Sequence, residues 1–229
     1  TAAMTDIVSC EADPVAANAI NALAVTELAR AATAVKSRFI HVSTDHFYTG
    51  DGDKIHSETA PVVLLNEYAR TKYVGETLAL SVPGALVVRT NIAGVRGWAE
   101  RPTFVEWAVH ALVNREPLTF FSDFVTSTID SSSLAEAIFS LAGIDASGIL
   151  NVAAHEPADK ATFLRAFASK LGIDAGWASE GSVAGLRPIR AESLGLDVGR
   201  AETLLGRELP DLDTVLERLA IQVRRAGLI

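Results

Sequence analysis

Tyr68 and Lys72 are the two residues whose types and spacing could do chemistry together. They stand four residues apart in a segment, 67–80, that is predicted to be helical, so both side chains would lie on one helix face. A tyrosine hydroxyl has a pKa near ~10, and an ammonium group within about 4–6 Å lowers it. The pair therefore suits general acid–base catalysis on an alcohol or a carbonyl. The alternative interpretation is a surface pair on a solvated helix face.

Hydroxyl groups follow a predicted strand that precedes this helix. Residues 38–43 (RFIHVS) are rich in apolar and β-branched side chains, which predicts a buried strand that ends at Ser43, Thr44 and Asp45. Open α/β sheets place ligand-binding groups at the carboxyl ends of parallel strands. A hydroxyl there could bind the substrate oxygen that Tyr68 protonates, or it could cap the turn after the strand. We interpret Asp45 as structural rather than catalytic.

Helices alternate along the chain with short, continuously apolar strands. Asp13 and Pro14 are typical of a helix start, and Ser133 with Glu136 has the spacing of a capping box. The glycine-containing segment 45–61 is predicted to be a long functional loop. This order predicts an α/β fold with a parallel sheet covered on both faces. The expected strands are 38–43, 85–89, 118–121 and 148–152, and the expected helices are 13–36, 67–80, 103–114, 133–143, 159–171, 199–205 and 212–226.

Composition excludes several classes of protein. The chain has 229 residues, is 49% hydrophobic and carries a net charge of −8, which does not suit binding to nucleic acid or to an anionic membrane. Its longest uncharged stretch, 14–26, is far shorter than the roughly 20 residues of a membrane span. The single cysteine, Cys10, excludes an internal disulfide and fits the reducing cytoplasm. The histidines show no H-x-x-x-H spacing, so we expect no metal site.

Three motifs together resemble a known superfamily. Ser43-Thr44-Asp45, Tyr68-Ala69-Arg70-Thr71-Lys72 and Gly75-Glu76 are similar to the motifs of the extended short-chain dehydrogenase/reductases, and within them to the dTDP-4-dehydrorhamnose reductase group. Weaker likenesses extend over most of the chain, at Ala2-Ala3-Met4-Thr5 with Glu11 and Asn21, Arg89-Thr90-Asn91, Leu134 to Ile138, Gly148 to Ala153, Arg187-Pro188 and Leu196-Asp197.

The resemblance implies a fold and a division of the chain. The expected fold is a Rossmann-like doubly wound parallel sheet, here without its N-terminal strands, with a smaller C-terminal substrate-binding lobe. Residues 1–93 and 131–153 would form the NAD(P)-binding domain, and residues 94–130 and 154–229 the nucleotide-sugar lobe.

The resemblance also implies a role for each site residue. Tyr68 would exchange the proton at the substrate oxygen, while Lys72 would lower the tyrosine pKa and hold the nicotinamide ribose. Thr44, with Ser43 as the second candidate, would hydrogen-bond the reacting oxygen. NADP or NAD would supply the hydride and a nucleotide sugar would be the substrate; a cytoplasmic homodimer is expected. The cofactor-binding candidates are Ala2, Ala3, Thr5, Tyr68, Lys72 and Thr90, and the substrate-binding candidates are Thr44, Asn91 and Arg187.

The chain departs from the family pattern in two respects. It has no glycine-rich turn between a strand and a helix, so we expect about 60 residues, two βαβ units of ~30 each, to precede Thr1, which we interpret as a truncation point, a processing point or the first ordered residue. The substrate-side motifs also differ, at Ile92-Ala93, Asp123-Phe124 and Thr126. Two alternatives therefore stay open: a non-catalytic nucleotide- or partner-binding regulatory relative, and an epimerase or dehydratase on the same fold.

Overall fold

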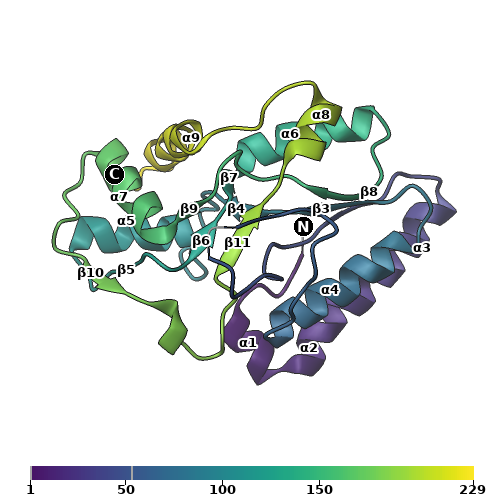
Figure 1. The fold of residues 1–229 in the computed structure, drawn as a ribbon, viewed down its shortest axis with the longest axis horizontal. Coiled ribbons are helices and arrows are strands. Elements are labelled where there is room, and N and C mark those ends of the chain that lie inside the picture. Colours follow the sequence, from purple (N-terminus) through teal and green to yellow (C-terminus); the bar gives the residue numbers. More distant parts are fainter. Residues whose placement is uncertain (1, 53) are drawn as a thin grey trace.

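Three parallel strands form the central sheet. The computed structural model describes residues 2–52 and 54–229, so the expectation about Thr1 lies outside the described residues. The strands run in the order β1-β3-β8, with Val42 beside Val88 and Val88 beside Leu150. Figure 1 shows this sheet running through the middle of the molecule. Its strands are β1 (Ile40–Val42), β3 (Leu86–Arg89) and β8 (Gly148–Asn151).

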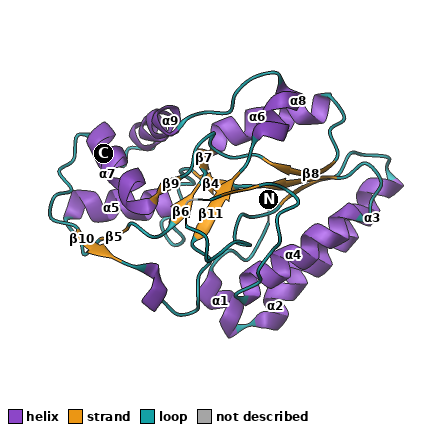
Figure 2. Cartoon of the chain, in the orientation of Figure 1, coloured by secondary structure: helices purple, strands orange, loops and turns teal. Residues whose placement is uncertain are grey.

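Helices cover both faces of this sheet because its buried side chains alternate along each strand. Val87 packs with Val25 and Ala79 on one face. Leu86 and Val88 belong to a larger cluster on the other face, with residues of two more helices. Figure 2 shows helices on either side of the strands. The predicted Rossmann-like parallel α/β fold is therefore confirmed. The covering helices are α3 (Ala24–Ala34) and α4 (Glu67–Leu80) on one face, and α6 (Ser131–Gly143) and α8 (Gly199–Leu205) on the other.

The N-terminal helical region is more divided than the sequence predicts. Asp13 caps a helix as expected, and its carboxylate accepts from the backbone N–H of Ala16 at 2.9 Å. The predicted helix 13–36 is interrupted by a π-helical turn, and α4 packs closely against that turn. A Cβ on Gly75 would lie 2.2 Å from the carbonyl oxygen of Asn21, so only glycine permits this approach. The segments are α1 (Ile7–Ala12), α2 (Pro14–Asn18), η1 (Ala19–Leu23) and α3.

A second hydrophobic cluster lies away from the three-stranded sheet. Phe120, Phe163, Phe167 and Leu219 are fully buried at its centre. Most of it lies within the predicted substrate lobe, and a short parallel pair of strands flanks it. Its elements are α5 (Phe104–Asn114), β5 (Thr119–Phe121), α7 (Lys160–Leu171), β10 (Ser179–Gly181) and α9 (Leu212–Arg225).

Short strands join the two clusters. Two of them pair in parallel, and four others run in the order β2-β11-β6-β9. Residues Leu194 and Leu196, which the sequence places in the substrate lobe, pack with the core of the three-stranded sheet. A short 3₁₀ turn, η2 (Val183–Gly185), precedes β11. The strands are β2 (Ile55–His56), β4 (Asn91–Ala93), β6 (Val125–Thr126), β7 (Thr128–Asp130), β9 (Ala158–Asp159) and β11 (Ser193–Leu196).

Helix α6 begins earlier than its sequence pattern indicates. Asp130 is the N-cap, and its carboxylate accepts from the backbone N–H groups of Ser132 and Ser133, both at 3.0 Å. The predicted cap at Ser133 was therefore wrong. A capping box does occur at the start of α5, where Thr103 and Glu106 bond each other's backbone N–H groups.

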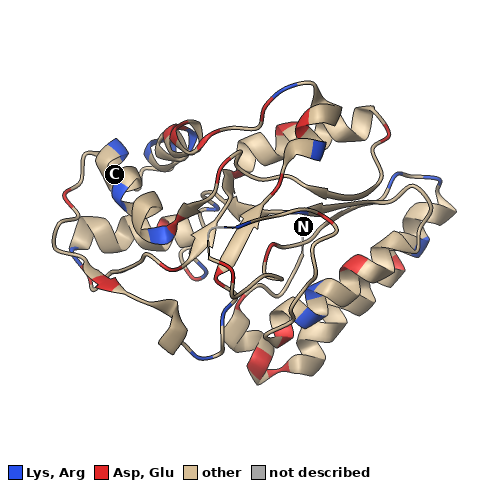
Figure 3. Ribbon diagram, viewed as in Figure 1, with Lys and Arg blue, Asp and Glu red and all other residues tan. Residues whose placement is uncertain are grey.

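Acidic and basic side chains are interspersed over the elements (Figure 3). No helix within residues 2–52 and 54–229 is long and apolar enough to cross a bilayer. Over the same ranges, no three His, Cys, Asp or Glu side chains are grouped so that they could hold a metal ion.

A buried ion pair joins α4 to the end of β3. Arg89 and Glu76 are 3% and 2% exposed, and Arg89 Nε donates to Glu76 Oε2 at 3.1 Å. Arg89 also donates to the Tyr48 hydroxyl at 2.9 Å, and Ser43 donates to Glu76 at 2.9 Å. Both charges are removed from water, so removing one side chain would leave the other as an uncompensated buried charge.

Replacing Arg89 with methionine is expected to lower the free energy of unfolding by about 3 to 5 kcal/mol, because the Glu76 carboxylate is left buried without its cation. Urea denaturation measures this loss. Arg30→Met is the matched control, since Arg30 pairs with Glu27 on the surface, where both side chains are more than 70% exposed. Equal losses in the two variants would contradict the structural importance of the buried pair.

Candidate active site

The candidate site lies at the carboxyl ends of β1 and β3. These strands are parallel neighbours, so Thr44 and Asp45 after β1 lie beside Thr90 and Asn91 after β3. Asn91 Nδ2 donates to Asp45 Oδ2 at 2.8 Å, which joins the two strand ends directly. The predicted residues Thr44, Thr90 and Asn91 therefore lie together at one edge of the sheet, and that this edge carries the site stays a prediction.

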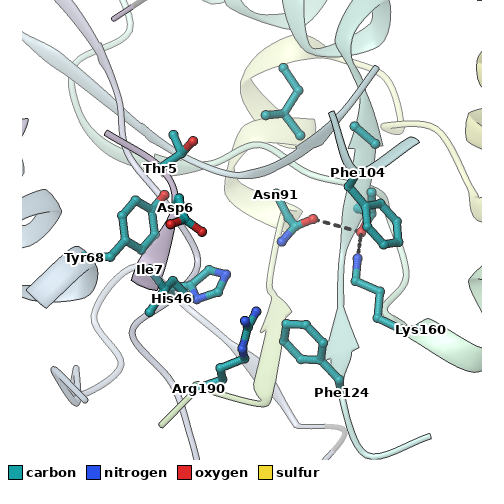
Figure 4. Close-up of a pocket in the computed structure, with 13 residues that line it drawn as sticks. Thr5, Asp6, Ile7, His46, Tyr68, Asn91, Phe104, Phe124, Lys160 and Arg190 are labelled. Atoms are coloured by element: carbon teal, nitrogen blue, oxygen red, sulfur yellow. Dashed lines mark hydrogen bonds between the residues drawn. The ribbon is translucent and has the colours of Figure 1, made fainter. Parts of the chain in front are cut away.

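A cavity of about 240 Å³ opens at this edge (Figure 4). Tyr68, Asn91 and Thr5, three of the predicted site residues, line it. Figure 4 shows Tyr68 and His46 on one side and Lys160 and Phe124 on the other. The remaining lining residues are Asp6, Ile7, Ile92, Ala93, Phe104, Thr128 and Arg190.

Tyr68 is held in the wall by the start of α4. Asn66 caps this helix by accepting from the Ala69 N–H at 2.9 Å, and its Nδ2 donates to the Ile189 carbonyl at 3.0 Å. The Tyr68 ring meets the His46 ring edge to face, with centroids 5.5 Å apart. Burial raises the pKa of Tyr68 to about 12, although the nearby Thr44 hydroxyl acts to lower that pKa. Tyr68 is therefore a proton donor at neutral pH.

Lys72 lies one helical turn after Tyr68, but its charge is directed elsewhere. Its Nζ donates to the Val42 carbonyl at 2.7 Å, and burial lowers the pKa of Lys72 to about 8. The sequence predicts that Lys72 lowers the pKa of Tyr68. In the structure the net change is a rise, because desolvation of the phenolate outweighs the favourable groups around it.

Ser43 and Thr44 occupy different environments. Ser43 donates its hydroxyl proton to Glu76 at 2.9 Å, within the buried ion-pair network, and does not line the cavity. Thr44 is 3% exposed and close enough to Tyr68 to act on its pKa. Thr44 does not line the cavity either, but its hydroxyl, unlike that of Ser43, acts on Tyr68, so Thr44 is the better candidate to act with Tyr68.

The predicted cofactor residues lie on one side of α4. Met4 exchanges two hydrogen bonds of 2.9 Å with the Asn21 side chain, which also donates to Thr71 on α4. This contact holds exposed Ala2, Ala3 and Thr5 near the start of α4. The buried Thr90 hydroxyl has no hydrogen-bond partner within residues 2–52 and 54–229. An unpaired hydroxyl and the Lys72 ammonium, which has protons left to donate, fit the ribose and amide groups of a nicotinamide nucleotide.

Arg190, rather than the predicted Arg187, reaches the cavity. Arg187 is exposed, and its guanidinium donates to the backbone carbonyl of Leu186 at 2.7 Å. Arg190 is half-buried in the cavity lining, and its Nε has no partner among the described residues. The resemblance indicated this segment, but residue type alone does not distinguish the two arginines.

Lys160 is the functional group that sequence reasoning missed most completely. It is the first residue of α7, where a charged side chain is usually solvated, yet it is only 8% exposed. Its Nζ lies 5.0 Å from the ring centroid of Phe104 and 5.3 Å from that of Phe163. It donates to Thr128 Oγ1 at 3.1 Å. No local sequence signal indicates this burial, because tertiary packing alone produces it.

Comparison with known proteins identifies the family. The model of the RmlD substrate binding domain matches residues 1–203. The "Probable low-salt glycan biosynthesis reductase Agl14" of Haloferax volcanii is 30% identical over 223 residues, which are 95% of this chain and 74% of that protein. The dTDP-4-dehydrorhamnose reductase of Mycobacterium tuberculosis (strain CDC 1551 / Oshkosh) is 34% identical over 163 residues, 68% of this chain and 52% of the relative.

Solved structures share the fold. A hypothetical dTDP-4-dehydrorhamnose reductase from Sulfolobus tokodaii has a TM-score of 0.80 at 28% identity, covering 93% of this chain and 76% of the other. The dTDP-4-dehydrorhamnose reductase of Bacillus anthracis, solved in complex with NADP, has a TM-score of 0.84 at 23% identity, covering 96% and 77%. The chain therefore belongs to the RmlD family, in the dTDP-4-dehydrorhamnose reductase-like group of the extended short-chain dehydrogenase/reductases.

Proposed function

We propose that this protein uses NAD(P)H to reduce a keto group on a nucleotide-linked deoxysugar. The observation that carries the proposal is the Tyr68 hydroxyl in the wall of a cavity lined by polar and apolar side chains, with Thr44 beside it and Lys72 one turn away. Tyr68 is protonated at neutral pH, because burial raises its pKa to about 12. It can therefore give its proton to the carbonyl oxygen as that oxygen becomes an alkoxide.

The cofactor would be held on the Tyr68–Lys72 side of the cavity. NADP or NAD supplies the hydride when bound. Lys72 and Thr90 would bind its ribose and amide groups, and the backbone at Ala2, Ala3 and Thr5 would lie along it. These residues orient the reacting groups, and Tyr68 contributes the proton.

The substrate would lie between Tyr68 and the opposite wall. Asn91 and Arg190 provide polar contacts, while Ile92, Ala93 and Phe104 provide an apolar surface that suits the methyl group of a 6-deoxysugar. The reductases of dTDP-4-dehydrorhamnose among the bacterial relatives support a dTDP-linked 4-keto sugar as the substrate. A cytoplasmic location and a homodimer are further parts of the proposal: the first rests on the single cysteine, Cys10, and the second on the sequence resemblance.

Tyr68→Phe is expected to slow NADPH oxidation with a dTDP-4-keto-6-deoxysugar by about 100-fold or more, because the proton donor is lost. Tyr73→Phe is the matched control on the same helix, since the Tyr73 ring packs against Phe47 away from the cavity. The rate of NADPH oxidation is measured for both variants and for the parent protein. Equal turnover by the parent and Tyr68→Phe would exclude the proposed proton transfer.

Arg190→Gln is expected to raise the KM for the nucleotide sugar about tenfold, because a charged donor is removed from the cavity. Arg187→Gln should change the KM much less, since Arg187 bonds its own backbone outside the cavity. Steady-state kinetics with saturating NADPH distinguish the two. A larger rise in KM for Arg187→Gln than for Arg190→Gln would instead identify Arg187, the residue that the family resemblance indicates, as the substrate contact.

A further inference from the structure

A chain of hydrogen bonds crosses the floor of the cavity. Lys160 Nζ donates to Thr128 Oγ1 at 3.1 Å, and Thr128 donates to Asn91 Oδ1 at 2.9 Å. Asn91 Nδ2 donates to Asp45 Oδ2 at 2.8 Å, and Thr44 donates to Asp45 Oδ1 at 3.3 Å. Figure 4 shows the first two links. The chain joins a buried cation on α7 to the hydroxyl beside Tyr68.

The Lys160 ammonium can only donate, so the Thr128 oxygen accepts from it. Thr128 Oγ1 also lies 2.8 Å from Thr126 Oγ1, and when Thr126 donates in that pair the Thr128 proton goes to Asn91 Oδ1. With its oxygen engaged by Thr128, the Asn91 amide presents its NH₂ group to Asp45. Lys160 therefore fixes the orientation of the amide that holds Asp45.

Thr44 has only one proton to donate. In the structure it is directed to Asp45, while the Thr44 oxygen accepts from the His46 N–H at 3.3 Å. A substrate carbonyl can only accept, so Thr44 cannot bond it while an ionised Asp45 takes the proton. A protonated Asp45 would donate to the Thr44 oxygen instead, and the Thr44 proton would become available to the substrate.

We propose that Lys160 is a positioning residue which, through Thr128, Asn91 and Asp45, decides whether Thr44 directs its proton to Asp45 or to the carbonyl oxygen of the substrate. The inference rests on the proposed function, because it assigns a role to the hydroxyl that acts with Tyr68. It also assigns Asp45, which the sequence indicates as structural, a part in preparing the site.

The electrostatics of the cavity agree with this geometry. Burial raises the pKa of Asp45, and the Lys160 charge opposes that rise; burial likewise lowers the pKa of Lys160, and Asp45 opposes that fall. The other titratable groups that face Asp45 are His46, Tyr48 and Tyr68. Burial lowers the pKa of His46 to about 4 and raises the pKa of both tyrosines, so all three are uncharged at neutral pH.

Lys160→Met tests the first step without any turnover. Methionine keeps an unbranched side chain among the phenylalanine rings but removes the cation. The titration midpoint of the Asp45 carboxyl, followed by ¹³C NMR, is expected to rise by about one pH unit, because one of the groups that oppose the effect of desolvation, the Lys160 charge, is removed. Lys170→Met, on the same helix and paired with Asp213, should leave the midpoint unchanged. An unchanged midpoint in Lys160→Met would overturn the proposal.

Thr128→Val provides a second test in case Lys160→Met fails to fold, because valine has nearly the same shape as threonine. It removes the hydroxyl bridge and leaves the Lys160 charge in place, so the Asn91 amide is no longer held. A smaller rise in the Asp45 midpoint is expected, because the hydrogen bond from Asn91 to the carboxylate weakens. A midpoint equal to that of the parent would contradict the proposed path.

The pH profile of kcat tests the second step. Activity should fall as the pH rises through the Asp45 midpoint, because Thr44 then donates to the carboxylate. In Lys160→Met this alkaline limb should move upward together with the midpoint. Asp45→Asn should remove this limb, because an amide can donate to Thr44 at every pH. If the alkaline limb of the kcat profile does not shift together with the titration midpoint of Asp45, the proposed role of Thr44 is wrong.

Failure of this inference can be told apart from failure of the proposed function. If the parent protein reduces no keto sugar, the proposed function fails, while the NMR midpoints still report whether Lys160 controls Asp45. If the parent reduces the sugar but the midpoint and the limb do not move in Lys160→Met, only the inference fails.

Discussion

The parallel register of β1 and β3 places Ile40 beside Leu86 and Val42 beside Val88, so the two strands end at the same level. Thr44 and Asp45 then continue from one strand, and Thr90 and Asn91 from the other. A shift of one residue would turn these side chains to the opposite face of the sheet and break the contact between Asn91 and Asp45. The floor of the cavity, the hydroxyl beside Tyr68 and the unpaired Thr90 hydroxyl all depend on this register.

Burial, rather than pairing of charges, dominates the acid–base character of the site. It raises the pKa of Tyr68 to about 12 and lowers those of Lys72 and His46 to about 8 and 4. In each case desolvation favours the uncharged form. A neutral tyrosine suits reduction, because the group must donate a proton to the carbonyl oxygen. The surroundings of Tyr68 therefore keep its hydroxyl protonated before any ligand binds.

Local patterns in the sequence predicted the central elements and the residues that follow them directly. The continuous apolar run of β3 and the capped start of α2 are properties of short segments, and the structure contains both. The helix predicted over 67–80 is present, and it carries Tyr68 and Lys72 one turn apart. The π-helical turn was missed because it arises where Gly75 meets Asn21, two residues that are far apart in the sequence.

The residues on the far wall could not be predicted from local patterns. Arg190 reaches the cavity because Asn66, at the start of α4, holds the Ile189 carbonyl beside it. Lys160 reaches it because α7 packs against α9 and Phe104 covers its side chain. Both depend on contacts between segments that are far apart in the sequence, such as Asn66 with Ile189 and Phe104 with Lys160. Residue type shows a charge at each position but does not show whether water surrounds it.

The position of Lys160 is unfavourable by itself. It is the first residue of α7, where the partial positive charge of a helix N-terminus disfavours a cation, and it is almost entirely removed from water. Three aromatic rings, the Thr128 hydroxyl and the charge of Asp45 offset this cost. An apolar side chain could fill the same space among the rings without that cost. The charge therefore makes physical sense only through its connection to Asp45, which ties the helical lobe to the strand end that carries Thr44.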